Sequence, residues 1–215
     1  KCNEVFPKDK IHMLGNPRAT IAKEAKFDEE YFKSLGLDLE KKTILIVMGS
    51  LGSSSVNELM KSALKGVDDN LQFLYVCGKD NSQDLNLFEN QKNIHVVPYV
   101  DTLRIYGHVD GMVCRAGATT LAEVTALGIP SIVIPSPYVA NNHQFYNASM
   151  LLRQQACRII EEKDLNAETL QGQIVSLYAN PIVYEQTHEH ALQMGKPNAA
   201  YDIIDLLKNI CKKGN

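Results

Sequence analysis

The stretch TILIVMGSLGSSS, residues 43–55, passes from an apolar run into a loop of glycine and serine. The run Thr43–Met48 is rich in β-branched residues and has the length of a buried strand. A segment with apolar positions at helical spacing, Ser54–Leu64, follows the loop. The stretch therefore predicts a strand, a short loop and a helix in direct succession.

The same pattern recurs along the chain. Further strands are expected at Leu71–Cys77, Ile94–Val100, Gly111–Cys114, Ser131–Pro135 and Cys157–Ile160. Further helices are expected at Asp84–Asn90, Ala118–Leu127, Asn142–Gln155, Asn166–Tyr178, Pro181–Met194 and Ala199–Cys211. Strand–helix alternation is typical of right-handed βαβ crossovers. We therefore expect an α/β fold with a Rossmann-like parallel sheet of about six strands, flanked by helices.

The two ends of the chain differ from this pattern. Residues 1–15 end at a turn and are expected to be the last strand and the linker of a preceding domain. Residues 16–215 are expected to form the Rossmann-like domain, closed by its C-terminal helices. Because the chain begins with Lys1 and shows no signal-peptide pattern, we expect a piece of a longer protein.

Composition narrows the class of partner. The 22 Lys and Arg residues and 25 Asp and Glu residues give a net charge of -3 without a basic stripe, which disfavours nucleic acid. Five cysteines without C-x-x-C spacing argue against a disulfide framework and a zinc site, and favour the cytoplasm. Without a D-x-D pair or an H-E-x-x-H pattern, no metal is expected.

The expected ligand site follows from strand order. In the common order 3-2-1-4-5-6, ligands lie beyond the carboxyl ends of the first and fourth strands. The loops there are MGSLGSSS, residues 48–55, and RAGATT, residues 115–120, and both lead into a helix. Free amides at a helix N-terminus bind phosphate, although Thr119 or Thr120 acting only as a helix cap is the alternative.

Charged and polar residues near these loops complete the expected site. Glu123 is placed to accept two hydrogen bonds from a ribose diol, the alternative being a solvated carboxylate. Arg18 and Arg115 are candidates to match phosphate charge, or are ordinary surface arginines. The segment PYVANNHQFYNA, residues 137–148, offers amides and a histidine to sugar hydroxyls, or caps its own helix. The absence of G-x-G-x-x-G and of a G-K-[ST] loop disfavours dehydrogenases and NTPases.

Six ordered blocks carry a family resemblance: GNPRAT, MGSLGS, VVPYVDTL, CRAGATTLAE, GIPSIVIPSP and NNHQFYNA. They resemble the carboxyl-terminal, donor-binding half of the MurG-type glycosyltransferases, which belong to glycosyltransferase family 28 and have the GT-B fold. These enzymes transfer GlcNAc from UDP-GlcNAc to undecaprenyl-pyrophosphoryl-MurNAc-pentapeptide (lipid I) in peptidoglycan synthesis. The resemblance extends from about Gly15 to the final helices.

The resemblance implies roles for nine residues. It assigns the ribose to Glu123, the uracil edge to the Val100 backbone, and the diphosphate to Ser50, Arg18 and the amides of Thr119 and Thr120. It places Ala118 near the sugar, with Gln144 and His143 at the GlcNAc hydroxyls. Two positions depart from the family pattern, because Met48 replaces a glycine and His143 stands where some members have glutamine.

The resemblance also implies partners and limits. No cofactor is expected, since UDP-GlcNAc is a substrate. The lipid I site, the membrane-associating patch and the general base belong to the other half, so this chain alone is expected to be inactive. The whole protein is expected at the cytoplasmic face of the bacterial membrane. The alternatives are a UDP-sugar-binding module, an epimerase or another GT-B enzyme that does not act on lipid I.

Overall fold

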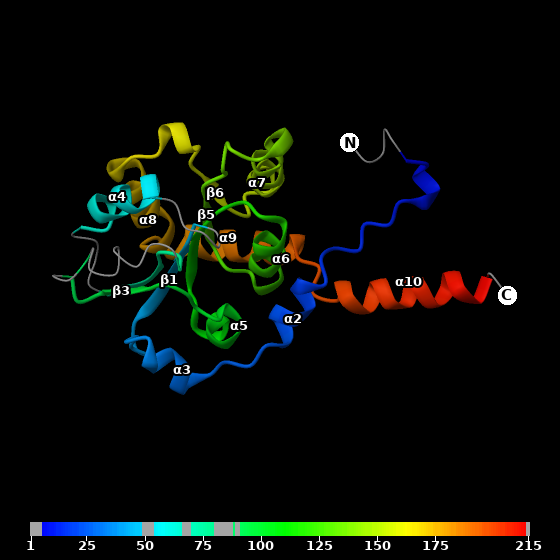
Figure 1. Ribbon diagram of the computed structural model, residues 1–215, viewed down its shortest axis with the longest axis horizontal. Coiled ribbons are helices and arrows are strands. Elements are labelled where there is room, and N and C mark those ends of the chain that lie inside the picture. The colour runs from blue at the N-terminus through cyan, green and yellow to red at the C-terminus, as the bar shows by residue number, and fades with distance from the viewer. Residues whose placement is uncertain (1–5, 49–53, 66–69, 80–87, 89–90, 214–215) are drawn as a thin grey trace.

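A computed structural model describes residues 6–48, 54–65, 70–79, 88 and 91–213. A parallel sheet of six strands lies at the centre of these residues (Figure 1). Its strands are β1 Lys42–Val47, β2 Leu71–Val76, β3 Ile94–Val97, β4 Gly111–Cys114, β5 Ser131–Val133 and β6 Arg158–Ile159. The spatial order is β3-β2-β1-β4-β5-β6, and every pairing is parallel. The predicted sheet and its order are confirmed.

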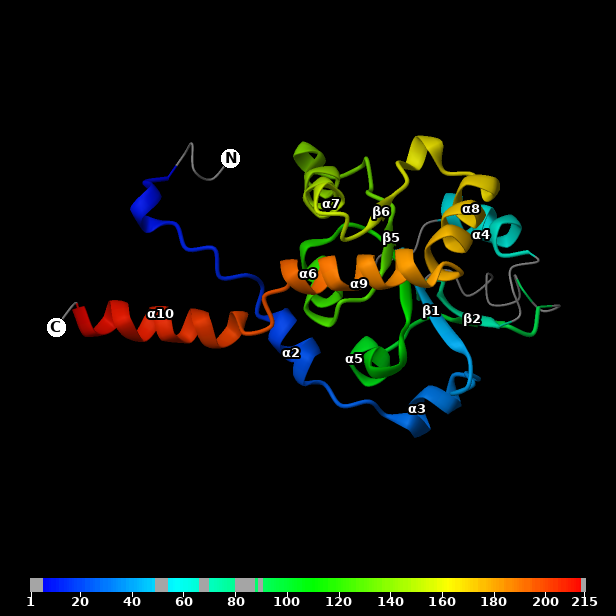
Figure 2. The same cartoon turned by 180° about the vertical axis from the view of Figure 1, so that it is seen from behind.

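The side chains of each inner strand point alternately to the two faces of the sheet and pack into two hydrophobic cores, one on each face. Ile44 and Ile46 of β1 lie in one core, and Leu45 between them lies in the other. Helices α4 (Ser54–Ala63) and α8 (Ala167–Tyr178) cover the first face. Helices α3 (Glu29–Ser34), α5 (Thr102–Ile105), α6 (Ala118–Leu127) and α7 (His143–Arg153) contribute to the second (Figure 2). Burial on both faces explains why the strands read as continuous apolar runs in the sequence.

Nine α-helices occur in the described ranges: α2 Arg18–Glu24, α3 Glu29–Ser34, α4 Ser54–Ala63, α5 Thr102–Ile105, α6 Ala118–Leu127, α7 His143–Arg153, α8 Ala167–Tyr178, α9 Pro181–Met194 and α10 Ala199–Lys213. Four 3-10 helices accompany them: η1 Lys8–Lys10, η3 Tyr106–His108, η4 Ala140–Asn142 and η5 Glu162–Asp164. The predicted long helices are confirmed to within a few residues. The helix expected at residues 84–90 lies outside the described residues, except for Phe88.

The sequence pattern does not predict the short helices between residues 16 and 42. Helix α3 begins after Asp28, whose side chain accepts a hydrogen bond from the Tyr31 amide at 2.9 Å. Helix α2 packs against α6. It thereby brings the GNPRAT segment to the helix that follows β4.

Two segments extend from the sheet domain on the same side, as Figure 1 shows. One is the N-terminal segment, whose described residues 6–15 contain η1 and no strand, so the strand expected there is not found. The other is α10, which exposes Tyr201, Ile204, Leu207 and Ile210. No helix within the described ranges is both long and apolar enough to cross a membrane. The division of the chain at residue 15 stays a prediction.

Candidate functional site

The sheet reverses its order between β1 and β4, which pair directly. The carboxyl ends of these two strands therefore lie side by side, where a doubly wound sheet binds its ligand. The loop after β4 leads into α6 and is described in full. The loop after β1, which includes Ser50, lies outside the described residues. The expected juxtaposition of Ser50 and Thr119 consequently stays a prediction.

The N-terminus of α6 is open. Gly117 is its N-cap residue, and no side chain caps the helix, so the cap role considered for Thr119 and Thr120 is wrong. Ala118 and Thr119 are exposed, and Thr120 is half-buried. The first amide to bond within the helix is that of Leu121, which donates to the Gly117 carbonyl at 2.9 Å. The preceding amides of the first turn are therefore suited to an anion.

Glu123 lies one turn further along α6 and is buried, with 5% of its surface exposed. One carboxylate oxygen, Oε1, accepts a hydrogen bond from Arg18 Nε. The other, Oε2, accepts one from the Tyr106 hydroxyl at 2.7 Å. The solvated-carboxylate alternative is therefore wrong, since both oxygens have protein partners.

Arg18 is the first residue of α2, and its side chain is about one-third exposed. Its hydrogen bond to Glu123 raises the pKa of the guanidinium above its ordinary value. Arg18 is therefore not an ordinary surface arginine, because it is paired with a buried carboxylate. Two residues 105 positions apart, both expected in a nucleotide site, form one ion pair.

Tyr106 is the residue that sequence reasoning missed. It lies in η3 and is only 5% exposed. Burial first, and then the charge of Glu123, raise the pKa of Tyr106 far above its ordinary value, so the hydroxyl remains a donor. The available sequence signal is weak: Tyr106 lies next to the apolar Ile105, and a tyrosine that becomes buried generally needs a polar partner for its hydroxyl.

Val100 follows β3 and is also buried, at 6% exposed. The next residue, Asp101, caps α5 by accepting a hydrogen bond from the Leu103 amide at 3.3 Å. The Asp101 amide in turn donates to the Tyr31 hydroxyl at 3.0 Å. The backbone expected to meet uracil is therefore fixed just before the helix that leads to Tyr106.

Gln144 holds two loops together at the same edge of the sheet. Its Oε1 accepts hydrogen bonds from the Ala116 amide at 3.2 Å and from the Ser136 amide at 2.9 Å. Asn147, one turn later on α7, donates to the Ala116 carbonyl at 3.2 Å. The sequence gives no sign of these roles, because the partners are backbone groups from two other loops.

His143 is exposed at the start of α7, and its Nδ1 lies 2.9 Å from the Ala140 carbonyl oxygen. Before it, Asn141 and Asn142 have φ of 55° and 50°, a left-handed conformation that asparagine tolerates. The side chain of Asn142 does not cap α7. The self-capping alternative for this segment is therefore wrong at the helix start.

Arg115 is bound to other protein groups. Its guanidinium donates to the Ile134 carbonyl at 3.2 Å and lies 2.6 Å from Glu162, in an ion pair whose side chains are 11% and 14% exposed. This arginine connects the β4 and β5 ends to η5. Because both side chains of this pair are largely buried, whereas Arg18 is about one-third exposed, Arg115 is a weaker candidate for phosphate than Arg18.

The domain model for the glycosyltransferase family 28 C-terminal domain matches residues 43–207. The chain belongs to this family. The transferases named UDP-N-acetylglucosamine--N-acetylmuramyl-(pentapeptide) pyrophosphoryl-undecaprenol N-acetylglucosamine transferase are similar over nearly all of it. The relative from Caldanaerobacter subterraneus is 39% identical over 94% of this chain and 57% of its own length. The relative from Bacillus cytotoxicus is 38% identical over 98% and 59%.

Solved structures agree with the fold of this family 28 chain. Acinetobacter baumannii MurG superposes with a TM-score of 0.73 at 28% identity, covering 87% of this chain and 55% of MurG. A structure titled UDP-N-acetylglucosamine 2-epimerase superposes at 0.68 with 15% identity, covering 96% and 53%, and shares the fold alone. The chain spans somewhat over half the length of the curated relatives it matches.

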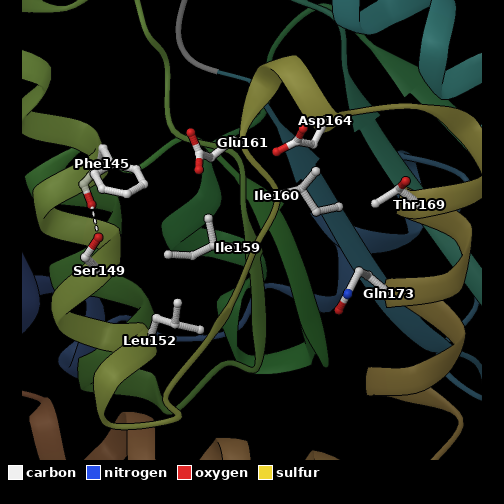
Figure 3. Close-up of a pocket in the computed structure, with 9 residues that line it drawn as sticks. All are labelled: Phe145, Ser149, Leu152, Ile159, Ile160, Glu161, Asp164, Thr169 and Gln173. Carbon is white, nitrogen blue, oxygen red and sulfur yellow. Dashed lines mark hydrogen bonds between the residues drawn. The ribbon is translucent and has the colours of Figure 1, made fainter.

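A separate cavity of about 290 Å³ lies beside α7, and none of the predicted site residues that the structure describes lines it. In Figure 3 Phe145 and Leu152 of α7 face Ile159 of β6, with Thr169 and Gln173 of α8 on the far side. Within the described ranges no three His, Cys, Asp or Glu side chains gather as metal ligands. At the β1–β4 edge the described residues offer the amides of the α6 N-terminus and the Arg18–Glu123 pair.

We expect Gln144→Ala to lower the free energy of unfolding by about 2 kcal/mol, because two backbone amides lose their acceptor. The neighbouring exposed residue provides the control, and His143→Ala should change stability by less than about 0.5 kcal/mol. Urea denaturation followed by circular dichroism measures both variants. Equal stability of the two would show that Gln144 does not hold the loops.

Proposed function

We propose that the chain is the UDP-GlcNAc-binding half of an inverting glycosyltransferase that transfers GlcNAc to lipid I in peptidoglycan synthesis. The observation that carries this proposal is the meeting of the open α6 N-terminus with the Arg18–Glu123 pair at the β1–β4 edge. The reaction is the one for which the similar transferases are named. The substrates and partners of the whole protein are part of the proposal.

The proposed site takes the parts of UDP-GlcNAc in order along the sheet edge. The uracil lies against the Val100 backbone, and the ribose reaches Glu123. The diphosphate takes the amides of Thr119 and Thr120, the guanidinium of Arg18, and Ser50. Helix N-termini and arginine are both suited to that charge. The sugar lies near Ala118, with His143 and Gln144 at its hydroxyls.

Gln144 offers one remaining group to the sugar in this scheme. Its Oε1 already accepts from Ala116 and Ser136, so its Nε2 amide is the end that donates to a hydroxyl. The same residue thus holds the α6 loop and contacts the donor sugar. Loss of Gln144 is therefore expected to affect the diphosphate as well as the sugar.

Transfer proceeds by attack of an acceptor hydroxyl on the anomeric carbon while UDP departs. Negative charge develops on the diphosphate, where the α6 amides and Arg18 stabilise it, and fixed donors of this kind contribute about 3 kcal/mol each. The scheme uses no metal and no cofactor. The general base, the lipid I site and membrane attachment are proposed for the other half of the protein, at the cytoplasmic membrane face.

Residues 1–15 are proposed as the end of the acceptor domain and its linker. Exposed apolar side chains support this placement, because Phe6 and Met13 lie in the segment that extends on the same side as α10. Helix α10 exposes its own apolar residues there, including Ile204 and Leu207. Large apolar side chains gathered on projecting segments are typical of contact surfaces.

The test is a comparison of binding and turnover. In calorimetry the chain should bind UDP-GlcNAc and UDP, and GDP should bind at least about 10-fold more weakly because the Val100 backbone fits uracil. With a lipid I analogue the isolated chain should release no UDP, whereas the whole-length protein should. Failure to bind UDP, or formation of an epimerised UDP-sugar by the chain alone, would contradict the proposal.

A further inference from the structure

The two oxygens of Glu123 have unlike partners. Oε2 bonds to the Tyr106 hydroxyl, which is buried, whereas Oε1 bonds to Arg18, whose side chain is about one-third exposed. The carboxylate is thus held from inside the domain at one oxygen and reached from the surface side at the other. Exchange of Arg18 for a ligand group would leave the buried bond to Tyr106 in place.

Tyr106 is itself fixed in place. Its ring is buried and its hydroxyl donates to Glu123, while the nearby Thr102 side chain offsets part of the rise in the Tyr106 pKa. Thr102 begins α5, immediately after the Val100–Asp101 segment. One short stretch therefore connects the backbone proposed for uracil to the carboxylate proposed for ribose.

We infer that Tyr106 is a positioning residue for nucleotide binding: it fixes Oε2 of Glu123 so that Oε1 is presented to a ribose hydroxyl. This inference rests on the proposed function. When the ribose hydroxyl donates to Oε1, Arg18 loses that acceptor and is freed toward the diphosphate. Arg18 and Oε1 of Glu123 each keep one hydrogen bond, because Arg18 exchanges the carboxylate for a phosphate oxygen and Oε1 exchanges Arg18 for the ribose hydroxyl.

Removing only the hydroxyl of Tyr106, by substitution with phenylalanine, tests the inference. We expect Tyr106→Phe to lower UDP affinity about 5- to 10-fold, since a mispositioned charged acceptor forms a weaker hydrogen bond. It should leave the affinity for 2′,3′-dideoxy-UDP within about 2-fold, because that ligand has no ribose hydroxyl to present. A structural defect would weaken both ligands alike. Titration calorimetry of the whole chain measures each affinity.

Tyr178 provides the matched control. It is buried, and its hydroxyl donates to backbone carbonyls, those of Met112 and Pro130, both at 3.2 Å. Tyr178→Phe removes the same atom from another part of the core. It should leave the preference for UDP over the dideoxy ligand unchanged.

The outcomes distinguish a failure of the Tyr106 inference from a failure of the proposed nucleotide site. If the wild-type chain binds UDP and the dideoxy ligand equally, the ribose role of Glu123 fails. If the wild type prefers UDP, and Glu123→Gln abolishes the preference while Tyr106→Phe retains it, Tyr106 does not position the carboxylate and the inference is overturned. A preference lost in both variants and kept in Tyr178→Phe supports it.

Discussion

Replacing Glu123 by alanine is expected to weaken UDP binding by about 1.5–3 kcal/mol, the range for hydrogen bonds to a charged group. The change removes the carboxylate that joins Arg18 to Tyr106 and leaves both donors without their acceptor. Because the site is buried, water replaces these bonds poorly. Titration calorimetry on the folded variant measures the loss.

Glu168 provides the control for this variant. It is an exposed carboxylate in the first turn of α8, on the other face of the sheet from α6. Glu168→Ala should leave UDP affinity unchanged within error. Unchanged affinity in Glu123→Ala as well would show that the buried carboxylate serves the fold and takes no part in binding.

Replacing Gly111 by alanine is expected to lower the free energy of unfolding by about 3 kcal/mol, the cost of overpacking a dense core. A Cβ at this position, the first residue of β4, would lie 2.2 Å from Cε1 of Tyr178 and 2.8 Å from Cδ1 of Ile44. Tyr178 cannot swing away freely, because its hydroxyl is hydrogen-bonded to two backbone carbonyls. Urea denaturation measures the change.

Gly172 makes a sharp comparison within the same chain. It lies in the middle of α8, where an added Cβ would meet no atom within 4 Å. Gly172→Ala should therefore raise stability by about 0.5–1 kcal/mol, since alanine favours a helix over glycine. Similar stabilities for the two variants would mean that the Tyr178 ring can move aside.

The sheet could be predicted from sequence because its inner strands are buried on both faces, so a run such as Ile44–Met48 is apolar throughout. Strand ends were harder: β3 stops at Val97, where Pro98 follows and has no N–H for the ladder. Helices α2 and α3 have seven and six residues, too few for a clear apolar period.

The site could be predicted only in outline. Sequence places Gly117 and Thr119 at the start of a helix, and the structure confirms the open N-terminus there. Glu123 bonds to Arg18 and Tyr106, which lie 105 and 17 positions away in the chain, and Arg18 reaches it because α2 packs against α6. Side-chain bonds between distant segments have no local sequence signal.

The location of the donor nucleotide is the central claim, and a crystal structure of the chain with UDP-GlcNAc tests it most directly. The account predicts uracil at the Val100 backbone, a ribose hydroxyl on Oε1 of Glu123, and the diphosphate at the α6 N-terminus with Arg18 turned toward it. A nucleotide bound elsewhere, such as in the cavity between α7 and α8, with the Arg18–Glu123 pair intact, would contradict it.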